Sequence, residues 1–158
     1  MADLIAKLYE LEKYDREFKD DGVVIKRAHI TDKQTILQFV KDNFTQSWAN
    51  ECEYAMFNSP PSCFIAVKEK QVVGFACYDA CAKGFFGPTG VMESERLKGI
   101  GTRLLMKSLY AMREMGYGYA IIGWTSDARA FYEKKVDAAA IIDSPPNKSI
   151  YKNMISQD

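Results

Sequence analysis

The chain of 158 residues is most simply one domain, because a chain of this length buries well over half of its unfolded surface around one core. Its 21 lysines and arginines balance 21 aspartates and glutamates, so no overall field favours nucleic acid as a partner. No positively charged leader precedes an apolar run, and no continuous apolar stretch is long enough to cross a bilayer. These features predict a soluble, cytoplasmic protein without a membrane partner.

The cysteines and the single histidine do not predict a metal site. Cys52, Cys63, Cys77 and Cys81 lack the paired Cys-x-x-Cys spacing of a zinc site, and His29 adds little as a further ligand. We therefore expect reduced, mostly buried thiols and no bound metal.

The N-terminal residues predict an amphipathic helix. Leu4, Leu8 and Leu11 recur at helical spacing, and Gly22 follows an Asp-Asp pair that would end the helix. We expect residues 1–21 to form a helical extension that caps the core or forms a contact in a homodimer.

One strand, two helices and a hairpin are predicted next. Residues 23–28 favour a strand, and Thr31 or Asp32 is expected to cap a helix whose apolar side continues to Phe44. A less regular helix is expected over residues 48–57. The predicted hairpin pairs residues 63–67 with residues 72–78 about Glu69-Lys70.

The fourth predicted strand, residues 85–92, leads into a basic turn with two glycines, Gly99 and Gly101. We call residues 96–102 the glycine turn. Glycine permits positive φ and a close approach of the backbone to a ligand, so successive N–H groups can converge on an anion at the start of the helix that follows. The turn lacks the third glycine of a dinucleotide fingerprint and the Gly-Lys-Ser/Thr of a Walker loop. The spacing of apolar residues predicts a helix that ends at Gly116.

The last third of the chain predicts a fifth strand over residues 119–124 and a short helix over residues 128–134, opened by Thr125 or Ser126. Two final strands are expected over residues 138–142 and 149–154, separated by a Ser-Pro-Pro-Asn turn.

Two of these motifs resemble the GNAT superfamily of acetyl-CoA-dependent N-acetyltransferases. The family's Arg/Gln-x-x-Gly-x-Gly/Ala stands as Arg96-Leu97-Lys98-Gly99-Ile100-Gly101, and its Ala-x-x-Phe-Tyr-Glu-Lys stands as Ala128-Arg129-Ala130-Phe131-Tyr132-Glu133-Lys134. The resemblance covers residues 23–154. It implies an α+β fold with a central mixed, mostly antiparallel sheet flanked by helices, in which the fourth and fifth strands splay apart. The family domain is expected to span residues 22–158.

The resemblance implies that acetyl-CoA is the cosubstrate and that its pantetheine arm lies between the splayed strands. Glycines at 87, 90, 118 and 123, with Pro88, would keep backbone groups there free for the amides of that arm. The residues expected to bind the cofactor are Val91, Met92, Arg96, Leu97, Lys98, Gly99, Ile100, Gly101, Thr102, Arg103 and Thr125. A backbone N–H near Val91 or Met92 would polarise the thioester carbonyl.

By the same resemblance, Tyr132 is the general acid that protonates the departing thiolate. The family's carboxylate on the fourth strand is replaced by Phe85-Phe86-Gly87, so Glu53, Asp79, Glu93 or water remain as candidate bases. Thr125 replaces an asparagine that is common in the family, and Asp137 is expected to take the left-handed turn where a glycine usually follows the tyrosine helix.

The sequence thus predicts an acetyltransferase that moves an acetyl group to a primary amine by direct transfer in a ternary complex. The first acceptor class expected is a small molecule and the second is a peptide or protein terminus or lysine, with Trp48, Tyr54 and Phe57 on the acceptor side of the site. The alternative is a non-catalytic acyl-CoA-binding sensor or interaction module, which would keep the glycine turn but lack a competent base.

Overall fold

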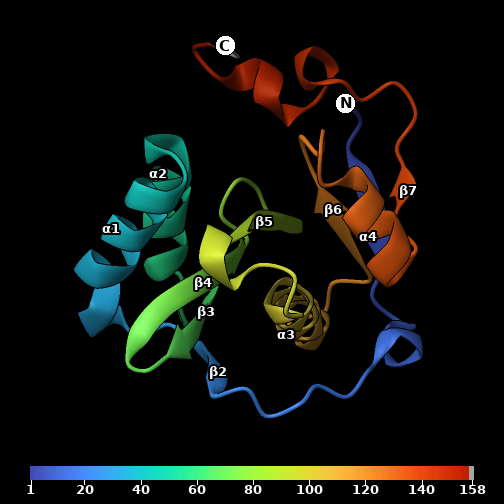
Figure 1. Ribbon diagram of the computed structural model, residues 1–158. Helices are drawn as coiled ribbons and strands as arrows, with labels where there is room; N and C mark the ends of the chain where they lie inside the picture. The colour runs from blue at the N-terminus through green and yellow to red at the C-terminus, as the bar shows by residue number, and fades with distance from the viewer. Residues whose placement is uncertain (157–158) are drawn as a thin grey trace.

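Seven strands form one sheet, in the order β2-β3-β4-β5-β6-β1-β7, in the computed structural model, which describes residues 1–156 (Figure 1). The strands are β1 (Leu4–Lys7), β2 (Val23–Arg27), β3 (Cys63–Lys68), β4 (Gln71–Tyr78), β5 (Phe85–Val91), β6 (Tyr119–Ile122) and β7 (Ala139–Ala140). Every neighbouring pair is antiparallel except β5 and β6, which run parallel. The predicted mixed, mostly antiparallel sheet is confirmed.

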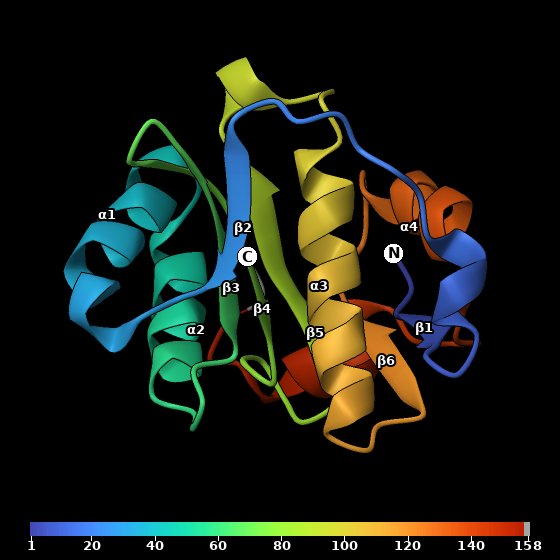
Figure 2. The ribbon, with the colours of Figure 1, turned by 90° about the horizontal axis from the view of Figure 1, so that it is seen from below.

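Four helices flank the sheet: α1 (Lys33–Asn43), α2 (Gln46–Met56), α3 (Ile100–Glu114) and α4 (Arg129–Val136). Figure 2 shows α1 and α2 on one side of strands β2 to β5 and α3 on the other. Two apolar clusters follow from this arrangement, one beneath α3 and one beneath α1 and α2. Among the helices of residues 1–156, none is long and apolar enough to cross a membrane.

Several turns adopt the conformations that their residues predict. Glu69 and Lys70, with φ of 50° and 64°, form the left-handed two-residue turn of the β3–β4 hairpin. Gly116 has φ of 102° immediately after α3, and Asp137 ends α4 with φ of 52°. The predicted hairpin and both helix ends are confirmed.

The helix predicted within residues 1–21 is wrong, because the chain begins with a strand. In β1, Leu4 and Ala6 are buried while Lys7 is exposed, which is the two-residue period of a strand. Strand β1 pairs with β6 on one side and β7 on the other, and a short 3₁₀ helix follows over residues 11–14. The spacing of Leu4 and Leu8 fits both a helix and a strand, whereas Leu11 fits only a helix, and pairing with the β6 edge decides the structure of residues 4–7.

The C-terminal strands also differ from the prediction. Only Ala139–Ala140 pairs within residues 138–142, and residues 149–154 contain a 3₁₀ helix, Ile150–Asn153, in place of a strand. Strand β1 occupies the position beside β6 that a C-terminal strand would need, and Pro145 and Pro146 cannot donate to a ladder.

The predicted helix caps are only partly right. Asp32 stands at the N-cap position of α1 but makes no capping hydrogen bond. Helix α4 begins at Arg129 with Ala128 as its N-cap, so neither Thr125 nor Ser126 opens it. The stretch that we expected to be less regular is the regular helix α2, capped by Thr45, whose side chain accepts a hydrogen bond from the Trp48 N–H.

Candidate functional site

Strands β5 and β6 part shortly after they meet. They pair only at Phe85–Ile121 and Phe86–Ile122, and beyond this point β5 continues beside β4 alone. We call the space between β5 residues 87–91 and the segment that follows β6 from Gly123 the strand opening. The predicted splay is confirmed, and it leaves the side of β5 that faces away from β4 without a neighbouring strand among residues 1–156.

The backbone N–H and carbonyl of Val91, the last residue of β5, face the strand opening. The Met92 N–H donates to the Val73 carbonyl at 2.9 Å and is therefore not available to polarise a thioester, contrary to expectation. Because successive N–H groups of a strand point in opposite directions, the Val91 N–H points away from β4. The Val91 carbonyl lies on the same side, where it accepts a hydrogen bond from Arg96 Nε at 2.9 Å.

The glycine turn has the geometry of an anion site. Leu97 and Gly99 have φ of 65° and 84°, so two of its residues are left-handed, and Gly99 is the N-cap of α3. Helix geometry leaves the N–H groups of Ile100, Gly101 and Thr102 without an intrahelical acceptor. The positive end of the α3 dipole lies at the same place, so the turn suits a diphosphate.

Two of the basic side chains of the turn already have partners. Arg96 donates a hydrogen bond to the Val91 carbonyl, and Lys98 Nζ lies 3.0 Å from a carboxylate oxygen of Glu95. Lys68 Nζ, from β3, lies 3.3 Å from both oxygens of the same carboxylate. The hydrogen bonds from Lys98 and Lys68 lower the pKa of Glu95. Both lysines share one carboxylate, so the cluster keeps a net positive charge beside the turn.

Arg103 is held by the segment that precedes β2. Its guanidinium donates to Asp21 at 3.2 Å and to the Val23 carbonyl at 2.9 Å, and it lies 5.7 Å from the centre of the Phe18 ring. Figure 2 shows this segment crossing the start of α3. A Cβ at Gly99 would lie 3.0 Å from the Phe18 ring, so this segment packs directly against the turn.

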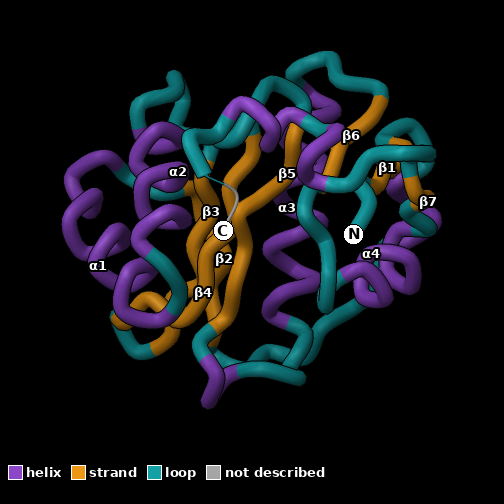
Figure 3. Tube along the Cα trace, turned by 90° about the horizontal axis from the view of Figure 1, so that it is seen from above, coloured by secondary structure: helices purple, strands orange, loops and turns teal. Residues whose placement is uncertain are grey.

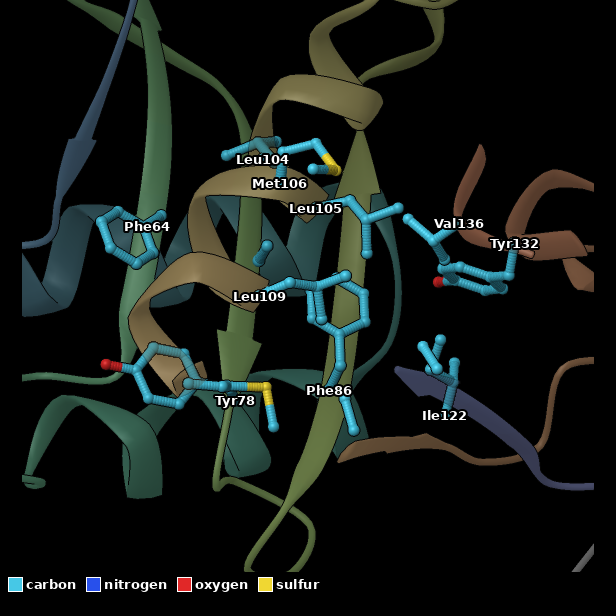
Figure 4. Packing of buried hydrophobic residues seen from close by; sticks show 14 of the residues in the cluster. Phe64, Tyr78, Phe86, Leu104, Leu105, Met106, Leu109, Ile122, Tyr132 and Val136 are labelled. Carbon is cyan, nitrogen blue, oxygen red and sulfur yellow. The ribbon is translucent and has the colours of Figure 1, made fainter. Parts of the chain in front are cut away.

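Tyr132 brings an unpaired hydroxyl to the base of the strand opening. The residue is 5% exposed, and its ring lies edge-on to Phe86, with the ring centres 6.1 Å apart, and to Phe131 (Figure 4). Phe86 is the last residue of β5 that pairs with β6. No described residue makes a hydrogen bond to the hydroxyl, and burial raises its pKa above the ordinary value. The hydroxyl thus stays protonated and available to a ligand.

Thr125 is buried at the other side of the opening, but its hydroxyl is already used. Thr125 Oγ1 donates to the Ala2 carbonyl at 3.0 Å, which ties the loop after β6 to the chain's N-terminal segment. The Thr125 hydroxyl therefore has no proton left to donate to a ligand, although its oxygen can still accept a hydrogen bond.

The three acids proposed as bases do not come together at the opening. Glu53 pairs with Lys33 at 3.3 Å. Asp79 is buried and accepts hydrogen bonds from the Gly84 N–H and the Tyr117 hydroxyl, at 2.8 and 3.1 Å. Glu93 is exposed on the 3₁₀ helix that precedes the glycine turn. Asp79 therefore has a structural role.

The acid that sequence reasoning missed is Glu51 on α2. It is partly buried, and no described residue bonds or ion-pairs with it. Burial raises its pKa. Its position beside Cys52 and one turn before Ala55, both buried, is the signal that could have placed it next to the protein interior.

The aromatic residues expected on the acceptor side do not form one wall. Trp48 packs on Phe44 and Phe75, with ring centres 5.3 and 6.2 Å away. Tyr54 and Phe57 are exposed on the outer side of α2. Trp48 is therefore core packing, and the other two are surface residues.

Three of the four cysteines converge between α2 and the β3–β4 hairpin. The Sγ atoms of Cys52, Cys63 and Cys77 lie within 4.8 Å of one another, and all three residues are buried and free of disulfides. The hydrogen bond with Cys52 and burial raise the pKa of Cys63, and burial raises that of Cys77. Hydrogen bonds from Cys63 and Cys77 lower the pKa of Cys52 to about 5. The predicted reduced, buried thiols are confirmed for these three, and Cys81 is partly buried.

Comparisons with known proteins agree with this site. The model of the acetyltransferase (GNAT) family matches residues 33–137, which include β5, the glycine turn and Tyr132. No curated protein matches the chain.

Among solved structures, a glucosamine N-acetyltransferase region of a fungal multi-domain β-N-acetylglucosaminidase is similar to 89% of this chain with a TM-score of 0.67 and 14% identity. A GCN5-related N-acetyltransferase from Sphaerobacter thermophilus gives 0.64 and 17%, also over 89% of this chain. The chain spans 19% of the first protein and 48% of the second.

A GNAT family acetyltransferase from Brucella melitensis, solved in complex with acetyl-CoA, is similar to 69% of this chain and is 80% covered by it, with a TM-score of 0.53 and 19% identity. At these identities the structural likeness establishes the fold, and the family model establishes the family. The splayed sheet, the glycine turn and the family match lead to one conclusion: this chain belongs to the GNAT family of acetyltransferases.

Proposed function

We propose that this protein transfers the acetyl group of acetyl-CoA to a primary amine of a small molecule. The observation that carries the proposal is the Tyr132 hydroxyl, which is protonated and has no hydrogen-bond partner among the described residues, on a side chain that is 5% exposed and lies next to the point where β5 and β6 part. No buried side-chain oxygen or nitrogen of the described residues lacks a hydrogen-bond partner, so this hydroxyl keeps contact with solvent, and a thiolate leaving group in the strand opening would accept its hydrogen bond.

The roles of the other residues follow from the geometry. The diphosphate lies on the N–H groups of residues 100–102, and Lys98, Arg96 and Arg103 surround it with positive charge. The pantetheine amides pair with β5 in place of a neighbouring strand, and the Val91 N–H faces the thioester arm. Four free cysteines suit a reducing compartment, which supports a cytoplasmic protein.

The reaction is proposed as direct transfer in a ternary complex. The amine nitrogen attacks the thioester carbonyl, the C–N bond forms, the C–S bond breaks, and Tyr132 supplies the proton that the coenzyme A thiolate takes up. The nitrogen loses one proton to water as the amide forms. The Tyr132 phenolate then regains a proton from solvent. Initial rates measured at several concentrations of both substrates should give intersecting lines, whereas parallel lines would indicate a covalent acetyl-enzyme.

Replacing Tyr132 by Phe tests the proposal. The hydroxyl has no protein partner, so Tyr132→Phe should leave the melting temperature and the affinity for coenzyme A, measured by calorimetry, unchanged. Turnover with a primary amine should fall by about 10²-fold, the usual contribution of a positioned acid. Unchanged turnover would remove Tyr132 from the mechanism. If acetyl-CoA binds and no amine in a broad panel is acetylated, the protein is an acyl-CoA sensor.

A further inference from the structure

Three thiols from three separate elements meet between α2 and the β3–β4 hairpin. Cys63 of β3 and Cys77 of β4 are direct partners across the hairpin, so their side chains share one face of the sheet. Cys52 comes from α2, which lies alongside this hairpin (Figure 3). All three residues are 0% exposed, and they belong to the apolar cluster beneath α1 and α2. We call Cys52, Cys63 and Cys77 the three-thiol cluster.

The sulfurs of the three-thiol cluster stand at the spacing of ligands around one metal ion. A metal–thiolate bond of about 2.3 Å, the length found for zinc, places three sulfurs spread evenly around an ion in one plane about 4 Å apart. The Sγ atoms of Cys52 and Cys63 are 3.9 Å apart, and all three Sγ atoms lie within 4.8 Å of one another. The lack of a Cys-x-x-Cys pair predicted no metal site, but strand pairing and helix packing bring distant cysteines to this spacing.

The number and kind of ligands indicate a soft ion that takes three sulfurs. Within residues 1–156, no histidine, aspartate, glutamate or further cysteine joins the cluster as a fourth ligand. Zinc usually completes a tetrahedron of four ligands, and Mg²⁺ and Ca²⁺ require oxygen ligands. Thiolates favour copper(I), which accepts three sulfurs in a plane. Copper(I) therefore fits the three-thiol cluster better than these other ions.

We propose that the three-thiol cluster binds one copper(I) ion through the Sγ atoms of Cys52, Cys63 and Cys77. Each thiol that coordinates the ion as a thiolate gives its proton to solvent, and copper stays in the +1 state, so no electron is transferred. The proposal goes beyond acetyl transfer and does not depend on it, because binding requires neither acetyl-CoA nor an amine.

Binding of the ion should change how easily α2 opens. All three sulfurs are buried, so the ion enters only when α2 moves away from the hairpin. Such local opening costs less free energy than unfolding of the whole chain. A bound ion links α2 to β3 and β4 and makes the opening rarer. The cluster thiols should therefore react with an alkylating reagent at least about 10-fold more slowly in the copper(I) complex than in the metal-free chain.

Copper(I) itself is the probe, and Cys81→Ala is the matched control, because this variant keeps the three-thiol cluster as its only thiols. The reduced, metal-free chain is titrated without oxygen in competition with a chromophoric copper(I) chelator. The wild type and Cys81→Ala should each bind one copper(I) per chain with the same affinity. X-ray absorption of the Cys81→Ala complex should show three sulfurs at about 2.3 Å from the copper.

Cys52→Ala, Cys63→Ala and Cys77→Ala each remove one sulfur. Each should lower the affinity for copper(I) by at least about 100-fold, since residues that only support a metal ligand already contribute about 10–100-fold. Circular dichroism before the titration shows whether each variant folds.

Three results would overturn the proposal: Cys81→Ala binds no copper(I), it binds the ion through fewer than three sulfurs, or a folded cluster variant keeps the wild-type affinity. If none of the cluster variants folds, the sulfur count in the Cys81→Ala complex decides. Three sulfurs support the site, and fewer than three exclude it.

Discussion

Two substitutions of Gly101 distinguish an effect on folding from an effect on ligand binding. A Cβ there would lie 3.8 Å from a Val91 methyl group and 3.9 Å from the Phe131 ring, which are ordinary contacts. Gly101→Ala should therefore stabilise the free protein by about 0.5–1 kcal/mol, because alanine favours a helix more than glycine does. For a domain of this size, that corresponds to a rise of about 2–4 °C in melting temperature. The methyl group leaves the backbone N–H groups free, so coenzyme A should bind as it does to the wild type.

Gly101→Asp should fold equally well, since a carboxylate in the first turn of α3 interacts favourably with the helix dipole. Its charge would, however, face the diphosphate. Two unit charges 4 Å apart repel by about 4 kcal/mol at an effective dielectric constant of 20. Solvent screening reduces this, so we expect the affinity for coenzyme A to fall by about 10²-fold. Thermal unfolding and calorimetry measure the two effects. An aspartate variant that folds normally and keeps wild-type affinity would refute the assignment of the diphosphate to this turn.

Three further predictions concern stability. Leu4→Ala, at a fully buried position of β1, should lower the free energy of unfolding measured in urea by about 2–5 kcal/mol. Ile5→Ala, at a partly exposed position of the same strand, should lower it less, and equal losses would contradict the alternation of buried and exposed residues in β1. Gly90→Ala should lower the free energy of unfolding by about 1–3 kcal/mol, because the added Cβ overlaps the Phe44 ring. Wild-type stability of this variant would show that the Phe44 ring can move aside without loss of stability. Burial raises the pKa of Glu51 above its unfolded value of about 4.3, so its charged form opposes folding. Glu51→Gln should therefore melt above the wild type at pH 8, and the difference should vanish below pH 4.

The structural predictions that depend on residues adjacent in the sequence agree with the structure. The Glu69-Lys70 hairpin, the positive φ of Gly99 and the end of α4 at Asp137 each depend on residues next to one another in the chain. The splay of β5 from β6 could be expected because the family motif, together with Pro88 and its neighbouring glycines, marks that strand.

The predictions that failed depend on contacts between distant parts of the chain. Leucines at positions 4, 8 and 11 fit a helix, and only the free edge of β6 turns that segment into a strand. The hydrogen bonds of the Met92 N–H and the Thr125 hydroxyl could not be predicted either, because their acceptors lie in other segments of the chain.

The place of β1 between β6 and β7 has a consequence for synthesis on the ribosome. Leu4 leaves the ribosome long before its partners Ile122 and Ala140 are made. Closing such a long loop is slow, because the entropy of a long segment is lost before the contact forms. Strands β2 to β5 can pair while the chain is still growing, whereas the apolar N-terminal strand must wait unpaired. We expect β1 to dock last, once β6 and β7 have both been made.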